Sequence, residues 1–221
     1  MSTLYLDIET IPSQDRKPDP SLVEPPGNYK NPDTIRAYQE AKADEVYRKL
    51  SLNPLWAQTI VISAAYGDGA IKAIYDKEEE QVFWGFEKYL NNLSLEPKST
   101  KDLIKQSPDT WTLVGYNIKE FDIPILFLRA KKYKCHTISK LLSGLSRYDR
   151  RIDDVMTMAL PTMGKQYVKM DELCKFFGIE GKGDIDGSKV YDYFLEGRLD
   201  EIAQYCQKDV ERTRELYNIL K

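Results

Sequence analysis

Histidine and cysteine are scarce in this chain of 221 residues, and their scarcity excludes several kinds of site. A single histidine, His136, removes every mechanism that needs two. The three cysteines are odd in number and form no Cys-x-x-Cys, which argues against a disulfide framework or a zinc ribbon. We expect Cys135, Cys174 and Cys206 to be small buried residues, and the protein to be cytoplasmic, in a reducing compartment.

Long apolar runs and an excess of basic residues are also missing. No stretch reaches the roughly 18 apolar residues that a membrane-spanning helix needs, so we expect no membrane partner. The N-terminus lacks the basic region of a signal peptide, and none is expected. Lys and Arg total 32 against 35 Asp and Glu, a formal net charge of −3. This balance excludes a polybasic protein held to nucleic acid by bulk charge, but leaves a small local site open.

What remains is the composition of an ordinary globular domain, with 42% hydrophobic and 30% charged residues. Apolar periodicity predicts strands at 4–10, 59–66, 70–75 and 111–116. It predicts helices at 33–50, 78–93, 122–132, 170–177, 188–196 and 200–220, with Ser188 as the cap of the fifth. Residues 151–160 fit either a helix or a strand. A hairpin followed by strand–helix units indicates an α/β fold, a mixed sheet with helices packed on its faces.

One acidic pair stands out from its surroundings. The pattern Asp-x-Glu occurs at positions 7 and 9, 76 and 78, and 209 and 211, and most such pairs are solvated surface charge. Asp7 and Glu9 lie inside a predicted strand whose opposite face carries Leu4, Leu6 and Ile8. Two carboxylates on one strand face repel each other unless a cation lies between them. Asp7 and Glu9 are therefore candidate metal ligands.

Two further motifs are ambiguous when each is taken alone. In the last predicted helix, Tyr205 and Asp209 are four residues apart and share one face, where a tyrosine is more often core than catalytic. The pattern Asn-x-x-x-Phe-Asp occurs once, at Asn117, Phe121 and Asp122, after a buried-type strand. An aspartate at the start of a helix is commonly a simple cap. Neither motif by itself indicates a catalytic site.

Together and in this order, the three motifs resemble the DEDD 3′–5′ exonucleases, which have a ribonuclease H-like fold. Tyr205 places the resemblance in the tyrosine branch (DEDDy), because Gln204 stands where the other branch has histidine. The chain more narrowly resembles stand-alone relatives of the proofreading exonuclease domain of family B DNA polymerases, through residues 7–12, 170–178, 181–187 and 205–213. Residues 13–55 fit least well. We expect one exonuclease domain over 1–221, with 13–55 as an insertion formed by a Pro-rich loop and a helix.

The resemblance implies a metal-dependent enzyme that hydrolyses terminal phosphodiesters at DNA 3′ ends, with single strands favoured, and releases nucleoside 5′-monophosphates. Hard divalent cations such as Mg²⁺ and Mn²⁺ prefer carboxylate oxygens, and four carboxylates can hold two of them. By the resemblance, Asp7 bridges both ions, Glu9 and Asp209 hold the water-activating ion, Asp122 holds the second through water, and Tyr205 orients the attacking water.

The resemblance also implies substrate contacts and leaves alternatives open. The Thr10 backbone, Asn117 and Phe121 are expected at the 3′-terminal nucleotide, although a place in the core is equally open for Phe121. The same site acting on RNA is one alternative, and a non-catalytic binding module on the exonuclease fold is another. All four carboxylates and Tyr205 are present, which argues against a decayed site. A role in replication or repair would require a separate partner.

Overall fold

A mixed sheet forms the centre of the protein in the computed structural model, which describes residues 3–94, 107–162, 167–181 and 186–221. Its five strands are ordered β3-β2-β1-β4-β5. They are β1 (Thr3–Pro12), β2 (Ala57–Tyr66), β3 (Lys72–Tyr75), β4 (Thr112–Gly115) and β5 (Ile152–Asp154). β1 pairs antiparallel with β2 and parallel with β4, and β4 pairs parallel with β5. The central strand is therefore the one that carries Asp7 and Glu9.

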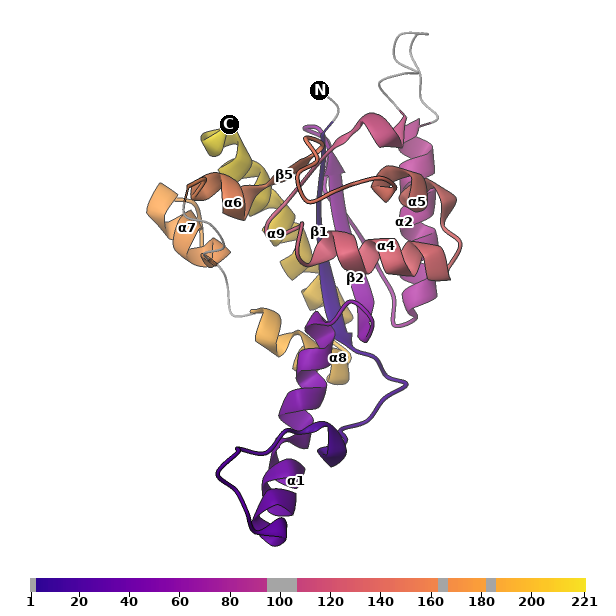
Figure 1. Ribbon diagram of the computed structural model, residues 1–221. Coiled ribbons are helices and arrows are strands. Elements are labelled where there is room, and N and C mark those ends of the chain that lie inside the picture. Colours follow the sequence, from indigo (N-terminus) through magenta and orange to yellow (C-terminus); the bar gives the residue numbers. More distant parts are fainter. Residues whose placement is uncertain (1–2, 95–106, 163–166, 182–185) are drawn as a thin grey trace.

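Helices cover both faces of this sheet, as the sequence predicts (Figure 1). One face packs against α2 (Glu79–Ser94), α4 (Asp122–Lys132) and α5 (His136–Leu142). The other packs against α6 (Val155–Ala159), α7 (Met170–Phe177), α8 (Val190–Leu195) and α9 (Leu199–Leu220). Alternation along β1 explains the division, because Leu4, Leu6 and Ile8 belong to the first core and Tyr5 to the second.

The predicted elements agree with the observed ones closely, with three corrections. β1 continues to Pro12, which pairs with Ala57 and does not end the strand early. Residues 151–160 contain both structures, since β5 is followed directly by α6 and the Asp154 carboxylate caps that helix. Ser188 is not a cap: the Asp186 side chain accepts the Ser188 N–H at the start of the short 3-10 turn Gly187–Lys189 that leads into α8. Part of the predicted loop 181–187 lies outside the described residues.

Residues 13–55 form an arm that extends from one end of the sheet (Figure 1). The arm contains a loop with a short 3-10 turn (Pro20–Leu22), the helix α1 (Pro32–Lys49) and a second 3-10 turn (Leu50–Leu52). α1 begins where the Asn31 side chain accepts the Asp33 N–H, and its other end is joined to α8 by an ion pair between Arg48 and Asp192. Among the described residues, every helix is too short or too polar to cross a bilayer.

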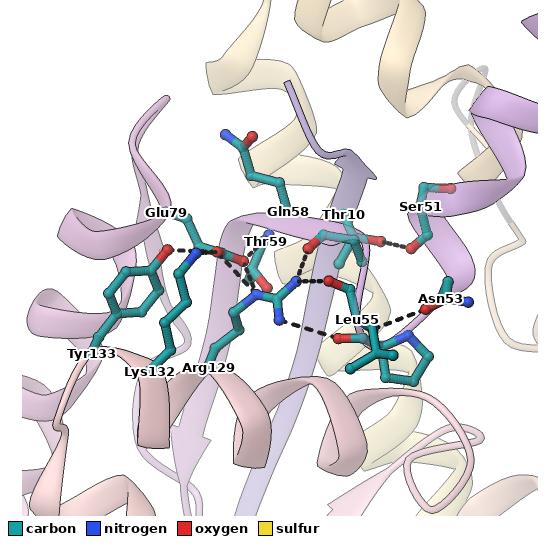
Figure 2. A network of polar contacts seen from close by, with 12 residues as sticks. Thr10, Ser51, Asn53, Leu55, Gln58, Thr59, Glu79, Arg129, Lys132 and Tyr133 are labelled. Atoms are coloured by element: carbon teal, nitrogen blue, oxygen red, sulfur yellow. Dashed lines mark hydrogen bonds and ion pairs between the residues drawn. The ribbon is translucent and has the colours of Figure 1, made fainter. Parts of the chain in front are cut away.

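A buried ion pair fastens the root of the arm to the body (Figure 2). Glu79 accepts the Arg129 Nε–H at 2.9 Å and the Thr59 backbone N–H at 2.7 Å. The Arg129 guanidinium also donates to the carbonyls of Pro54, Leu55 and Ala57. These bonds satisfy a buried charge and fix the segment that connects the arm to β2.

Candidate active site

A cavity of about 470 Å³ lies beside the end of β1, and most of the predicted site residues line it. The predicted site residues that line this cavity are Asp7, Glu9, Thr10, Asn117, Phe121, Tyr205 and Asp209. Asp122 is not among the residues that line the cavity, and its side chain is buried with 2% exposure. The fold thus gathers residues from the start, middle and end of the chain at one place.

A bulge in the pairing of β1 with β2 lies beside this cavity. Glu9 pairs with Val61 and Thr10 with Thr59, so Ile60 is an extra residue on β2 and forms a bulge. A bulge bends the pair of strands and changes the direction of the side chains beside it. Thr10 consequently lines the cavity next to Glu9, and its hydroxyl donates to the Ser51 carbonyl at 2.7 Å.

The carboxyl groups on β1 repel one another. Burial raises the pKa of Asp7 well above its ordinary value, and the nearby charges of Glu9, Asp122 and Asp209 raise it further. The Cys206 thiol opposes this rise in pKa by donating to the Asp7 carboxylate at 3.2 Å. Cys206 is therefore buried, as expected, but it also serves as a hydrogen-bond donor. A positive charge in the cavity would relieve the repulsion.

Asp122 is hydrogen-bonded to the backbone of the same strand. Its carboxylate accepts the backbone N–H of Ile8 at 3.2 Å, which a simple helix cap would not do. Burial raises the pKa of Asp122 to about 8, although hydrogen bonds from its own backbone and from Ile8 oppose that rise. Asp122 thus lies against the β1 backbone, in contact with the residue between Asp7 and Glu9, and close enough for its charge to raise the pKa of Asp7.

α9 contributes the third motif and a residue that sequence reasoning missed. Burial raises the pKa of Tyr205, and the charges of Glu9, Asp209 and Asp7 raise it further, so the phenol is neutral at neutral pH. The missed residue is Arg212, which donates to the Asp209 carboxylate at 2.9 Å. Its guanidinium also donates to the carbonyls of residues 180 and 181, after α7. The Asp–Arg spacing of three on a helix is the only sequence signal for this pair.

The segment after β4 is held by a second missed residue, Asp154. Its buried carboxylate accepts the backbone N–H groups of Asn117 at 3.1 Å and Lys119 at 3.2 Å. These bonds hold Asn117 at a φ of 59°, a left-handed conformation in which its side chain lines the cavity. Phe121 is half-buried, packs on the first core and also lines the cavity.

The donor set at this cavity fits a hard divalent cation. Four acids line it, namely Asp7, Glu9, Glu120 and Asp209, and no Lys or Arg does so in the part of the chain that the structure describes. Ligand atoms of Asp7, Glu9 and Cys206 lie within 4.8 Å of one another. Carboxylate oxygens are the ligands that Mg²⁺ and Mn²⁺ prefer, whereas the thiol is occupied by its bonds to Asp7.

Comparisons with known sequences find a family and a relative that this chain resembles. A family model described as a predicted 3′–5′ exonuclease related to the exonuclease domain of PolB matches residues 90–220. The matched span contains Asp122, Tyr205 and Asp209 and begins after Asp7 and Glu9. The uncharacterized protein MJ0365 of Methanocaldococcus jannaschii is 26% identical over 191 residues, which are 81% of this chain and 95% of that protein.

A solved structure shows the same fold. The family B DNA polymerase from the hyperthermophilic archaeon Pyrobaculum calidifontis matches with a TM-score of 0.61 and 19% identity. The match covers 100% of this chain and 24% of the polymerase chain, so this chain spans about a quarter of the length of that protein. The likeness shows the ribonuclease H-like fold that the sequence predicts.

Proposed function

Because this chain belongs to the family of predicted 3′–5′ exonucleases related to the exonuclease domain of PolB, we propose that it is a DEDDy-type 3′–5′ exonuclease. It hydrolyses the terminal phosphodiester of a DNA strand and releases nucleoside 5′-monophosphates. One observation carries the proposal: Asp7, Glu9, Tyr205 and Asp209 line a single cavity that none of the described Lys and Arg residues lines. We assign this activity to one domain over residues 1–221, with 13–55 as an insertion.

Two divalent cations, Mg²⁺ or Mn²⁺, are the proposed cofactors. Asp7, Glu9 and Asp209 would hold them directly, and Asp122 would act through a water molecule. Cations bound there activate the attacking water and stabilise the leaving 3′ oxygen. Burial raises the pKa of Asp7 and that of Asp122, and the charges of Glu9, Asp122 and Asp209 raise the pKa of Asp7 further, so a bound cation would favour the ionised form of both groups.

The remaining residues of the cavity position water and substrate. Tyr205 is a neutral hydrogen-bond donor in this environment, so it orients the attacking water and does not remove its proton. Asn117 and Phe121 contact the 3′-terminal nucleotide, together with the Thr10 backbone. A pocket that holds one terminal nucleotide favours single-stranded 3′ ends, because a paired end would first have to separate. DNA as the substrate rests on the likeness to a DNA polymerase.

The test is the digestion of a 5′-labelled single-stranded DNA oligonucleotide by the purified protein. With Mg²⁺ or Mn²⁺ the label should appear on a ladder of stepwise shorter products, and EDTA should stop the reaction. Asp7→Asn should abolish digestion while the protein stays folded by circular dichroism. The matched control is Asp76→Asn in the second Asp-x-Glu pair, which does not line this cavity and should keep full activity.

Two outcomes would change the assignment. Digestion by Asp7→Asn at the wild-type rate would show that the activity comes from elsewhere. A matched RNA oligonucleotide digested faster than DNA would move the substrate to RNA. If the wild-type protein shortens neither polymer and calorimetry detects no divalent-ion binding, the fold acts as a binding module and the proposal is wrong.

A further inference from the structure

A second cavity, of about 360 Å³, adjoins the candidate active site at the root of the arm. The two cavities share four lining residues, Thr10, Ser51, Leu52 and Gly187. The other residues that line the second cavity are Glu45, Arg48 and Lys49 of α1, and Ser188 and Tyr191 beyond it. A continuous depression therefore runs from the acidic cavity on β1 to the end of α1.

The charge changes along this depression. Of the charged residues that the structure describes, only acids line the first cavity, whereas the second has two cations and one acid, Glu45. Lys49 is exposed and pairs with Glu45 at 2.8 Å. An exposed pair of this kind contributes little free energy, so the Lys49 ammonium can exchange Glu45 for a phosphate. The second cavity is thus better suited to backbone phosphates than the first.

Aromatic and apolar surface accompanies these cations. The Arg48 guanidinium is fixed by ion pairs with Asp44 and Asp192, both at 2.8 Å, and lies 5.1 Å from the centre of the Tyr191 ring. Leu52 is 65% exposed at the boundary between the two cavities, where a base could cover it. Sites for single-stranded nucleic acid combine cations along the backbone with aromatic faces for the bases.

The wall between the cavities is held in place before any ligand binds. The Thr10 hydroxyl donates to the Ser51 carbonyl, and the Arg129 guanidinium holds the carbonyls of Pro54 and Leu55 (Figure 2). Leu52 lies between these attachments. A wall already in position loses little conformational freedom on binding, which favours affinity.

We propose that the second cavity is a subsite for the nucleotides that precede the 3′-terminal one in a single strand. The proposal rests on the exonuclease function proposed above, and it gives the arm a role. Lys49 and Arg48 bind the backbone phosphates, and Tyr191 and Leu52 provide surface for the bases. The strand then passes from the active-site cavity over Leu52 to the end of α1.

Two substrates distinguish binding at this subsite from binding at the active-site cavity. The p-nitrophenyl ester of thymidine 5′-monophosphate offers only a terminal nucleotide and a leaving group, whereas a single-stranded oligothymidylate also reaches the subsite. In Lys49→Glu, the ratio of the oligothymidylate KM to the ester KM should rise about tenfold. The slope of log KM for the oligothymidylate against log salt should fall by about 0.7 for each phosphate that the variant no longer neutralises.

Lys42→Glu is the matched control. Lys42 is on the same helix, pairs with the same Glu45 at 2.7 Å and lines neither cavity. It lies about 10 Å further along the helix axis, and the KM ratio should stay within about twofold of wild type. Hydrolysis of neither substrate by the wild-type protein would overturn the exonuclease function itself. Hydrolysis of both, with equal KM ratios in the two variants, would overturn the subsite and leave the function intact.

Discussion

The Asp122 carboxylate and the Ile8 backbone N–H form a hydrogen bond of 3.2 Å between residues 114 positions apart. β4 pairs with β1 only over Thr3–Tyr5, so the Ile8 N–H lies beyond the end of that pairing. Asp122 supplies the acceptor that β4 does not. One side chain therefore satisfies the β1 backbone between Asp7 and Glu9 and adds a third carboxyl group close to theirs.

Asp122→Asn should stabilise the metal-free protein in a pH-dependent way. The pKa of Asp122 is raised by burial from its ordinary 3.8 to about 8 in the folded state, and asparagine keeps an oxygen acceptor without ionising. Below pH 4 the carboxyl group is protonated in both the folded and the unfolded wild-type protein. Between pH 4 and 8 it ionises in the unfolded protein but not in the folded one, so the free energy of unfolding of the wild type falls as the pH rises. The advantage of the variant in free energy of unfolding, measured in EDTA, should therefore grow across this window by up to about 1.4 kcal/mol per pH unit.

Thermal unfolding followed by circular dichroism between pH 4 and 8 measures this difference. Added Mg²⁺ should reduce it, because the wild-type protein gains stability from the bound ion. A Tm difference that is constant with pH would show that Asp122 is ionised throughout.

Arg212→Met should lower the free energy of unfolding by about 3 kcal/mol, since it leaves a buried carboxylate at Asp209 without its guanidinium partner. Mg²⁺ should raise the Tm of this variant more than that of the wild type, because a bound cation replaces part of the lost charge. Thermal unfolding with and without Mg²⁺ measures both effects. If Mg²⁺ raises the Tm of the variant and of the wild type by the same amount, Asp209 does not bind the ion.

Arg129→Met should cost about 3–5 kcal/mol in urea unfolding, because Glu79 is then buried without its main partner. The double variant Arg129→Met, Glu79→Gln should recover part of this loss, since it removes the uncompensated charge. The control is Lys132→Met, an exposed partner of Glu79 at 3.7 Å, which should cost at most about 1 kcal/mol. Equal losses in the two single variants would contradict the dominant role of Arg129.

Gly115→Ala should destabilise the protein by about 1–3 kcal/mol, because a Cβ there would lie 2.8 Å from the Cβ and Cδ1 atoms of Ile118. The displaced Ile118 follows Asn117 directly, so the KM for the oligonucleotide should rise as well. Gly27→Ala, with no described atom within 4 Å of the new Cβ, should leave both quantities unchanged. Chemical denaturation and steady-state kinetics test the pair. A Gly115 variant as stable as Gly27→Ala would refute the close packing.

The sequence predicts well the elements that are determined by a pattern of neighbouring residues in the chain. Alternation along β1 places Leu4, Leu6 and Ile8 in one core and separates them from Asp7, because a period of two is visible in any short strand. The helix predicted at 122–132 has the same bounds in the structure. The three motifs also predict which residues share a cavity, with the exception of Asp122.

What the sequence does not predict depends on contacts between distant residues. Asp154 accepts N–H groups more than 30 residues away, and neither the bulge beside Thr10 nor the Glu79–Arg129 pair leaves a local pattern. Single aspartates and arginines are ordinary surface residues until tertiary packing buries them. The residues that position the site are therefore visible only in the structure.

The candidate site combines residues of β1 and α9, which are added to the growing chain at different times. Glu9 and Asp209 are 200 residues apart in the sequence. At translation rates of about 5–20 residues per second, Asp209 is added about 10–40 s after Glu9. The β1 carboxylates therefore have neither Asp209 nor the Cys206 thiol beside them during that interval. The candidate site is thus incomplete until α9 has been made.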